Sequence, residues 1–279
     1  MRVHASSVNP IDNAIAAGML KDMVEHVFPV MLGRDYAGVV EAVGTDVTKF
    51  SVGDEVFGFI PGMAANVHDG SWAELIVVPD NISIVRKPDG VDIATAGAAP
   101  LAATTAMASI DALGLSQGNT VLVVGATGGV GSFAVQLAAQ AAATVIAPAL
   151  PEDEDYLRGL GVTEIVPRDG EVAAAVRELH PDGIGALLDL VSHAPGTYDA
   201  ALKDSARVAS TNGAAGDSPG RTNVLAMPTT ENLERLAHLL DAGALTVHVQ
   251  DTYSLDEVAE ALLALGASHV QGKLALRVG

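Results

Sequence analysis

The stretch TVLVVGATGGVG, residues 120–131, decides the fold of this chain. Its apolar, β-branched run Thr120–Val124 predicts a buried strand, and the Ala- and Val-rich run Gly129–Ala142 predicts a helix. The glycines therefore lie in a strand-to-helix turn, where backbone N–H groups and the positive end of the helix dipole attract anions. A glycine-rich turn without a ligand is the alternative, but the strand–turn–helix context favours dinucleotide binding.

Each small residue of this turn has an expected task. Gly128 allows the backbone to approach a pyrophosphate, and Gly131 allows the helix to pack closely on the strand. Ala126 replaces the first glycine of the usual pattern, which gives A-x-G-x-x-G. Together with Gly129 and Val130, these residues form the expected cofactor-binding turn.

Composition excludes several classes of partner. The 279 residues include 15 basic and 34 acidic side chains, a net charge of −19, which repels nucleic acids and anionic membranes. There is no cysteine, hence no disulfide and no thiolate metal ligand. The first residues, MRVHASSVNP, lack the apolar segment of a signal peptide, and no apolar run has membrane length. We therefore expect a cytoplasmic protein that binds neither nucleic acid nor membrane.

The chain changes character near Ala98. Before it, short β-rich runs alternate with turns, which is typical of an antiparallel, barrel-like domain. The expected strands are Tyr36–Val43, Glu55–Phe59, Trp72–Val78 and Ile82–Val85. After it, strands and helices alternate, which predicts a parallel sheet with right-handed crossovers. The elements expected beyond the glycine-rich turn include strands Thr144–Ala147, Glu164–Val166, Ala186–Val191, Ala206–Ser210 and Lys273–Val278, and helices Glu154–Leu160, Glu171–Leu179, Gly196–Leu202 and Glu231–Leu240.

Four segments in the right order resemble the medium-chain dehydrogenases/reductases. They are PVMLGRDYAGVVEAVGTDVTKFSVGDEVFGF (29–59), AAPLAATTA (98–106), VLVVGATGGVGSFAVQLA (121–138) and QGKLALRV (271–278). The branch that this chain resembles is that of the zinc-independent quinone oxidoreductases. The resemblance implies an α/β fold: a GroES-like β-barrel catalytic domain over residues 1–97, a Rossmann doubly wound parallel-sheet domain over 98–244, and a return to the catalytic domain over 245–279.

That resemblance also implies an activity, the NAD(P)H-dependent reduction of a small quinone or α,β-unsaturated carbonyl, and a homodimer. Two alternatives stay open. One is an enoyl reductase acting on polyketide or fatty-acyl thioesters. The other is a non-catalytic cofactor-binding paralogue or redox sensor, because Ala14 and Leu20 stand where many relatives carry tyrosines.

A catalytic zinc is not expected. Zinc-dependent members of the superfamily carry a cysteine in the first active-site segment and Gly-His-Glu in the second. Here these segments read SSVNPID (6–12) and Gly33-Arg34-Asp35, and the histidines elsewhere are scattered. Hydride transfer would then depend on positioning, with a hydrogen-bond donor for the substrate oxygen.

The resemblance assigns Asn9 and Asp12 to the substrate cleft as catalytic residues. Asn9 could donate a hydrogen bond to the substrate carbonyl oxygen. The competing interpretation is structural, because Asn-Pro and Asp favour turns and cap helices.

Further cofactor contacts follow from the resemblance, and several have structural alternatives. Thr105 would lie beside the nicotinamide or merely brace its helix, and Lys273 would bind the cofactor or be a solvated charge. The remaining candidates follow two expected strands, where parallel sheets bind ligands. They are Asp189 and Val191, then Ser210, Thr211, Asn212 and Gly213.

The choice between NADP(H) and NAD(H) is less defined. NAD-binding folds place an acid about twenty residues after the first motif position, which is Ile146–Pro148 here, and none is present. The following Glu152–Asp155 are all acidic and would repel a 2′-phosphate unless they face solvent, with Arg158 the nearby cation. The resemblance alone favours NADP(H), with NAD(H) possible.

The first residues lie almost directly on the R-V-x-A-x-S-V-N-P-x-D segment, whereas relatives generally begin with about a hairpin more. We expect an exposed sheet edge, and so a catalytic lobe that is less stable than the Rossmann lobe or is covered by a partner.

Overall fold

The computed structural model describes residues 1–61, 66–267 and 269–279. The chain forms two compact units, one of Met1–Thr104 with Met227–Gly279 and the other of Thr105–Ala226. These limits differ from the boundaries expected at residues 97/98 and 244/245. The first observed limit, between Thr104 and Thr105, lies inside the helix Pro100–Leu113. The helix expected over Glu231–Leu240 belongs to the unit that holds both termini.

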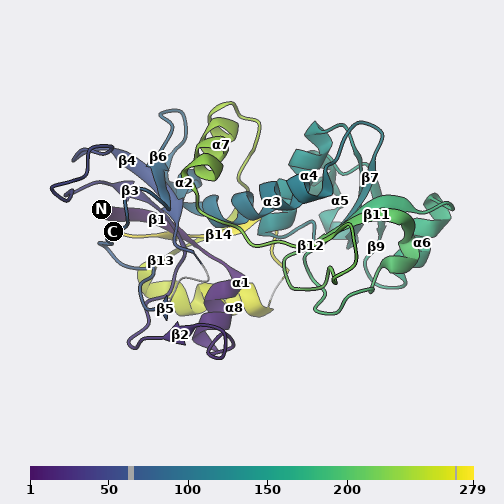
Figure 1. Cartoon of the computed structure of the whole chain (residues 1–279), viewed down its shortest axis with the longest axis horizontal. Helices are drawn as coiled ribbons and strands as arrows, with labels where there is room; N and C mark the ends of the chain where they lie inside the picture. Colours follow the sequence, from purple (N-terminus) through teal and green to yellow (C-terminus); the bar gives the residue numbers. More distant parts are fainter. Residues whose placement is uncertain (62–65, 268) are drawn as a thin grey trace. The chain divides into compact units, whose positions relative to one another are not determined.

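Residues 105–226 build a six-stranded parallel sheet in the order β12-β11-β10-β7-β8-β9 (Figure 1). Val121, Leu122 and Val123 are fully buried, as expected for a central parallel strand covered on both faces. The strands are β7 (Thr120–Val124), β8 (Thr144–Ala149), β9 (Glu164–Pro167), β10 (Ile184–Asp189), β11 (Leu202–Ser210) and β12 (Arg221–Asn223). The helices are α4 (Gly129–Gln140), α5 (Glu154–Leu160) and α6 (Val172–Leu179), with 3₁₀ turns at Pro151–Asp153 and Asp199–Ala201.

The helix expected over Gly196–Leu202 is wrong. A single 3₁₀ turn, Asp199–Ala201, stands there, and Leu202 already begins β11, paired with Ile184. Gly196 has a φ of +86°, which a regular helix does not permit. Ala201 and Leu202 are both buried in the core on which α6 packs, and Leu202 enters the sheet instead of continuing a helix.

The unit that holds both termini is built on a mixed six-stranded sheet in the order β13-β14-β1-β3-β4-β6. Figure 1 shows the purple β1 beside the yellow β14, and their antiparallel register pairs Ala5 with Arg277. The strands are β1 (Arg2–Val8), β3 (Asp35–Val39), β4 (Glu55–Phe59), β6 (Ile84–Arg86), β13 (Val249–Ser254) and β14 (Lys273–Arg277), with β2 (Glu25–His26) and β5 (Asn66–Val67) in a second small sheet. The helices are α1 (Pro10–Ala16), α2 (Ile93–Ala98), α7 (Thr230–Asp241) and α8 (Val258–Ala267), a 3₁₀ turn covers Leu255–Glu257, and α3 (Pro100–Leu113) spans the division between the units.

The strand expected over Trp72–Val78 is also wrong. This segment runs beside the start of β1 but makes a single bridge, between Leu75 and Arg2. The N–H of Ala73 turns back to Ser71 O, and this local turn interrupts a regular ladder. β1 itself is paired on both sides, so the sheet edges lie at β13 and β6 rather than at the first strand. Among the described residues, no helix combines the length and apolarity needed to span a bilayer.

Candidate active site

The glycine-rich turn directly follows β7 and is shaped by close backbone approach. Gly125 has a φ of +85°, and a Cβ there would stand 3.0 Å from Val191 Cγ2. A Cβ on Gly131 would stand 2.1 Å from Gly125 O and 2.6 Å from Ala126 Cα, so α4 packs on the turn as the sequence predicts. Gly125 was not among the residues expected at this site, although a glycine directly after a buried strand is a visible signal in the sequence.

Gly128 differs from these two glycines because space lies in front of it. Its Cβ position meets nothing nearer than Gly125 O at 3.7 Å, and its φ of −74° is an ordinary value. Gly128 is the N-cap of α4 and, as a glycine, offers no side-chain acceptor to the first N–H groups of the helix. The first N–H groups of a helix lack intrahelical acceptors, so they need an external partner. The turn thus offers donors and room to an anionic group.

The turn follows β7, which lies between β10 and β8 in the sheet. The chain runs β7, β8, β9 along one side and then crosses to β10 on the other side of β7. Such a reversal of strand order opens a crevice at the carboxyl ends of the strands, where doubly wound sheets bind ligands. The turn after β7 and the loop after β10 therefore lie at the switch point of this unit.

The loops after β10 and β11 are held by internal hydrogen bonds. Asp189 is buried, and its Oδ1 accepts from the N–H groups of Val191 and Ser192 at 3.0 and 2.9 Å. Ser210 Oγ accepts in the same way from Asn212 N at 3.1 Å and Ala214 N at 3.2 Å. Asp189 and Ser210 therefore shape the loops.

The other candidates around these loops differ in exposure. Val191 is 54% exposed, and Asn212 and Gly213 are exposed as well. Thr211 is half-buried, while Thr105 on α3 is buried and accepts a bond from Ser109 Oγ through its carbonyl oxygen. Exposure leaves Val191, Asn212 and Gly213 within reach of a ligand at the switch point.

The acidic stretch after β8 has two kinds of member. Glu152, Glu154 and Asp155 face solvent, whereas Asp153 is fully buried. Arg158 lies 3.9 Å from Glu154 in an exposed i,i+4 pair. Most of these carboxylates thus meet the condition of facing water, and the choice between NADP(H) and NAD(H) stays a prediction.

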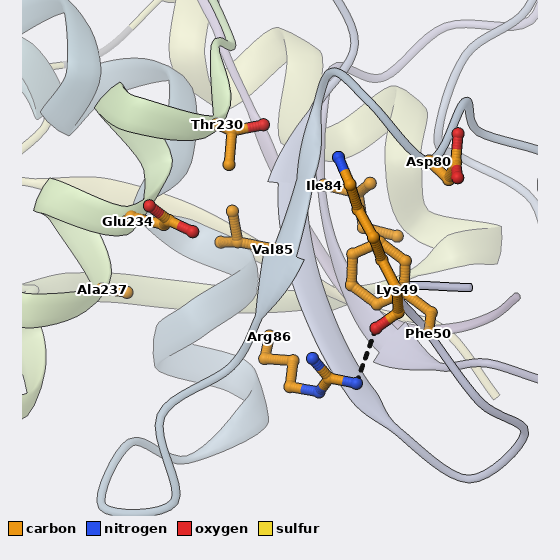
Figure 2. Close-up of a pocket in the computed structure, with 9 residues that line it drawn as sticks. All are labelled: Lys49, Phe50, Asp80, Ile84, Val85, Arg86, Thr230, Glu234 and Ala237. Carbon is orange, nitrogen blue, oxygen red and sulfur yellow. Dashed lines mark hydrogen bonds between the residues drawn. The ribbon is translucent and has the colours of Figure 1, made fainter. Parts of the chain in front are cut away.

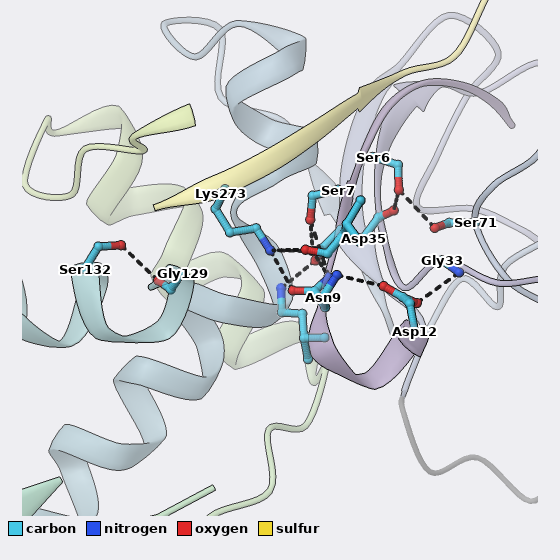
Figure 3. A network of polar contacts seen from close by, with 12 residues as sticks. Ser6, Ser7, Asn9, Asp12, Gly33, Asp35, Ser71, Gly129, Ser132 and Lys273 are labelled. Carbon is cyan, nitrogen blue, oxygen red and sulfur yellow. Dashed lines mark hydrogen bonds and ion pairs between the residues drawn. The ribbon is translucent and has the colours of Figure 1, made fainter. Parts of the chain in front are cut away.

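A buried polar network occupies the other unit (Figure 3). Lys273 is 3% exposed, and its Nζ donates to Asn9 Oδ1 at 2.6 Å and lies 3.7 Å from Asp35 Oδ2. Asn9 Nδ2 donates to Asp35 Oδ2 at 2.8 Å and to Ser7 Oγ at 3.4 Å. Leu101 N, in the first turn of α3, donates to Asp35 Oδ1 at 2.6 Å. Lys273 is therefore not a solvated charge, and the Asn9 amide is already engaged.

Asp12 performs the structural task that was the alternative to a catalytic role. Its Oδ2 accepts from Asn9 N at 2.8 Å, one half of a capping box at the start of α1, and its Oδ1 accepts from Gly33 N at 3.1 Å. Burial is the main cause that raises the pKa of Asp12 to about 6, against the opposing effects of these hydrogen bonds and of Arg34. Figure 3 shows Asp12 joining α1 to the segment before β3.

A separate hollow of about 480 Å³ lies on the unit with both termini (Figure 2). Its wall includes Phe50, Arg86 and Glu234, and Arg86 Nη2 donates to Lys49 O at 2.7 Å. None of the predicted site residues lines it, so it is distinct from the two regions described above.

Comparison with known proteins gives consistent matches. Residues 1–89 match the alcohol dehydrogenase GroES-like domain, and residues 160–276 match the zinc-binding dehydrogenase family. The mitochondrial NAD(P)H oxidoreductase RTN4IP1 of Mus musculus is 30% identical over 326 residues, an alignment that covers all of this chain and 81% of the relative. The chain belongs to the medium-chain dehydrogenase/reductase superfamily.

Two further proteins are similar over nearly the whole chain. The 2-methylene-furan-3-one reductase of Solanum lycopersicum is 28% identical, with 99% of this chain and 70% of the relative covered. The quinone oxidoreductase structure from Coxiella burnetii superimposes with a TM-score of 0.83 at 28% identity, covering 100% of this chain and 89% of that one. The predicted pair of a GroES-like domain and a Rossmann domain is thereby confirmed.

The Gly33-Arg34-Asp35 segment carries buried polar groups for which the sequence alone indicated no role. Asp35 joins Ser7, Asn9 and Lys273, and Arg34 is 1% exposed. In the sequence, Arg34 and Asp35 were visible only as departures from the Gly-His-Glu pattern of zinc-dependent relatives. The described residues contain no group of three or more His, Asp or Glu side chains that could hold a metal ion.

Proposed function

We propose that this chain is a zinc-independent NAD(P)H-dependent oxidoreductase that transfers a hydride to a quinone or an α,β-unsaturated carbonyl. The relatives named above support an oxidoreductase that uses a nicotinamide cofactor. The observation that carries the proposal is the turn after β7, whose open Gly128, a glycine N-cap without a side-chain acceptor, stands at the switch point of a parallel sheet.

The residues of the turn fit a dinucleotide. N–H groups at the start of α4 would hold its phosphates, and the open space at Gly128 would admit them without displacing a side chain. The loops after β10 and β11, fixed by Asp189 and Ser210, would border the rest of the cofactor. When bound, the nicotinamide supplies the hydride.

The protein's part in the reaction is to bind, orient and supply donors. Rigid loops hold the reactants in one geometry, which lowers the entropic cost of the transfer. A quinone or enone gains negative charge on its carbonyl oxygen as it accepts hydride, so a hydrogen-bond donor accelerates the step.

The donor set supports zinc independence. The sequence has no cysteine, and Arg34 stands where zinc-dependent relatives carry a histidine. The Lys273 ammonium lies 2.6 Å from Asn9 Oδ1, in the other of the two segments. Asp35 accepts hydrogen bonds on both carboxylate oxygens, so its lone pairs are already directed at protein donors.

Titration of the purified protein with NADPH and with NADH, read by nicotinamide fluorescence, tests cofactor binding. Addition of 9,10-phenanthrenequinone to the same sample then tests turnover by absorbance at the reduced-nicotinamide band. Binding followed by oxidation supports the proposal. Binding with turnover only on a crotonyl thioester favours an enoyl-thioester reductase, and binding without turnover on any acceptor favours a sensor. Failure to bind either cofactor overturns the enzymatic proposal.

A further inference from the structure

The hollow beside β6 takes no part in the proposed reaction (Figure 2). It is lined by the segment before β4, by β6 and by α7, all of which belong to the unit that holds both termini. Its volume of about 480 Å³ lies in the range of about 300–1,000 Å³ that is typical of small-molecule sites. A ligand can therefore bind here without any contribution from the glycine-rich turn.

The walls of the hollow are tied together by hydrogen bonds. Ser83 N donates to Pro228 O at 2.8 Å, which joins the segment before β6 to the segment before α7. Arg86 Nη2 donates to Lys49 O at 2.7 Å, which joins β6 to the segment before β4. A ligand that enters a preformed site loses less binding free energy to ordering of the protein.

Arg86 supplies a fixed cation on one wall. Its guanidinium lies 5.5 Å from the centroid of the Phe50 ring, and Nη2 also donates to Asp54 Oδ2 at 2.7 Å. Its Nε and Nη1 donate to no residue in the described part of the chain, and the side chain is 60% exposed. The guanidinium is thus held in one orientation with donors left for an anionic group, and Lys49 adds a second cation to this wall.

The opposite wall is acidic, and the floor between the walls is apolar. Figure 2 shows Glu234 on α7 and Lys49 on the other side of β6. Neither side chain forms an ion pair within residues 1–61, 66–267 and 269–279, and Asp80 adds a second carboxylate. Val85, which is 5% exposed, and Ala237 line the space between the charges. This arrangement is complementary to a ligand that carries both signs of charge on an apolar body.

We propose that this hollow binds a zwitterionic aromatic amino acid. Its carboxylate would meet Arg86 and Lys49, its ammonium would meet Glu234, and its ring would lie on the apolar floor. The net charge of −19 repels a free anion at long range, whereas a zwitterion carries no net charge. Phe50 and Val85 favour a ring over a short polar side chain, because aromatic rings bury a large apolar area.

Calorimetric titration of the full-length chain with L-tryptophan, without cofactor, tests this site. The ligand efficiency of small molecules predicts a Kd of about 0.5 mM. Tryptamine lacks the carboxylate and 3-indolepropionate lacks the ammonium, so each should bind about fivefold more weakly, as expected for the loss of one exposed ion pair. L-Alanine lacks the ring and should give no measurable binding.

Variants of α7 locate the ligand. Ala237→Phe places a ring in the hollow and should abolish L-tryptophan binding. Glu234→Gln should weaken L-tryptophan about fivefold but leave 3-indolepropionate unchanged, because only the first ligand carries an ammonium. Glu231→Gln, an exposed position of the same helix that does not line the hollow, is the matched control and should leave both affinities unchanged. Thermal midpoints close to that of the parent verify that the variants fold.

The outcomes separate this site from the cofactor turn. Weakening in Ala237→Phe and Glu234→Gln, with no change in Glu231→Gln, supports the proposal. Absence of L-tryptophan binding overturns it, and so does equal affinity of the parent chain for L-tryptophan and 3-indolepropionate. Displacement of L-tryptophan by saturating NADPH, with unchanged affinity in Ala237→Phe, places the ligand at the glycine-rich turn and also overturns it.

Discussion

The two candidate regions satisfy their polar groups in opposite ways. The turn after β7 has a glycine N-cap without a side-chain acceptor and keeps space in front of Gly128. The network around Asp35 is closed, since Ser7, Asn9 and Leu101 all donate to one buried carboxylate. An open region can accept a ligand without breaking protein contacts, whereas a closed one holds elements in place. The comparison assigns binding to the first region and positioning to the second.

The largest expected effect separates two glycines of the open turn. Gly131→Val places side-chain atoms against Gly125 O, where a Cβ alone would stand at 2.1 Å, and should lower the free energy of unfolding by more than about 4 kcal/mol. Gly128→Val meets open space, so this variant should fold and lose NADPH affinity instead. Urea unfolding and NADPH titration measure the two effects. Equal stability loss in both variants would contradict this division of tasks.

The next effect tests the closed network. Lys273→Met removes the cation beside Asp35 and Asn9, and breaking a buried pair costs about 3–5 kcal/mol. Amide hydrogen exchange should show the loss in β1 and β14, which pair beside this network. The exposed Lys21→Met is the matched control and should change the free energy of unfolding by less than about 0.5 kcal/mol. Unchanged protection of both strands would refute the network's structural role.

A smaller effect follows from the buried Asp12. Burial raises the pKa of Asp12 to about 6 from its ordinary value of 3.8, so between these values the folded chain keeps a proton that the unfolded chain releases. The contribution of Asp12 to stability should therefore fall as pH rises through this window, by at most about 3 kcal/mol. Urea unfolding from pH 4 to 7 should show this slope in the parent and not in Asp12→Asn. Asp22→Asn, at an exposed position, should keep the pH slope of the parent. The same slope in Asp12→Asn and in the parent would disprove its assignment to Asp12.

The smallest effect concerns the loop beside the open turn. Asp189→Ala removes the acceptor for two backbone N–H groups and should cost about 1–3 kcal/mol. Asp189→Asn keeps an acceptor oxygen and should cost less. NADPH affinity, measured by fluorescence titration, should fall more in Asp189→Ala than in Asp189→Asn, because the loop loses its fixed shape. A larger loss of affinity in Asp189→Asn would instead indicate that Asp189 contacts the cofactor directly.

Local pattern was sufficient wherever neighbours in sequence are neighbours in space. The strand at Thr120–Val124, the helix from Gly129 and the packing role of Gly131 follow from β-branched residues, small residues and glycine spacing. It failed where distant segments compete. Leu202 joined β11 rather than a helix because Ile184 pairs with it, and Trp72–Val78 made one bridge beside β1 instead of a ladder.

The sequence by itself determined the superfamily, the parallel sheet and the position of the glycine-rich turn, because these depend on short periodic patterns and ordered motifs. Only the tertiary structure decided the contacts of Asn9 and Lys273. Lys273 lies far along the chain from Asn9, yet β14 pairs with β1 and brings its ammonium to the start of α1. Which donors are spent and which remain free depends on such long-range pairing, since a hydrogen bond is fixed by the distance between two atoms and not by their separation in sequence.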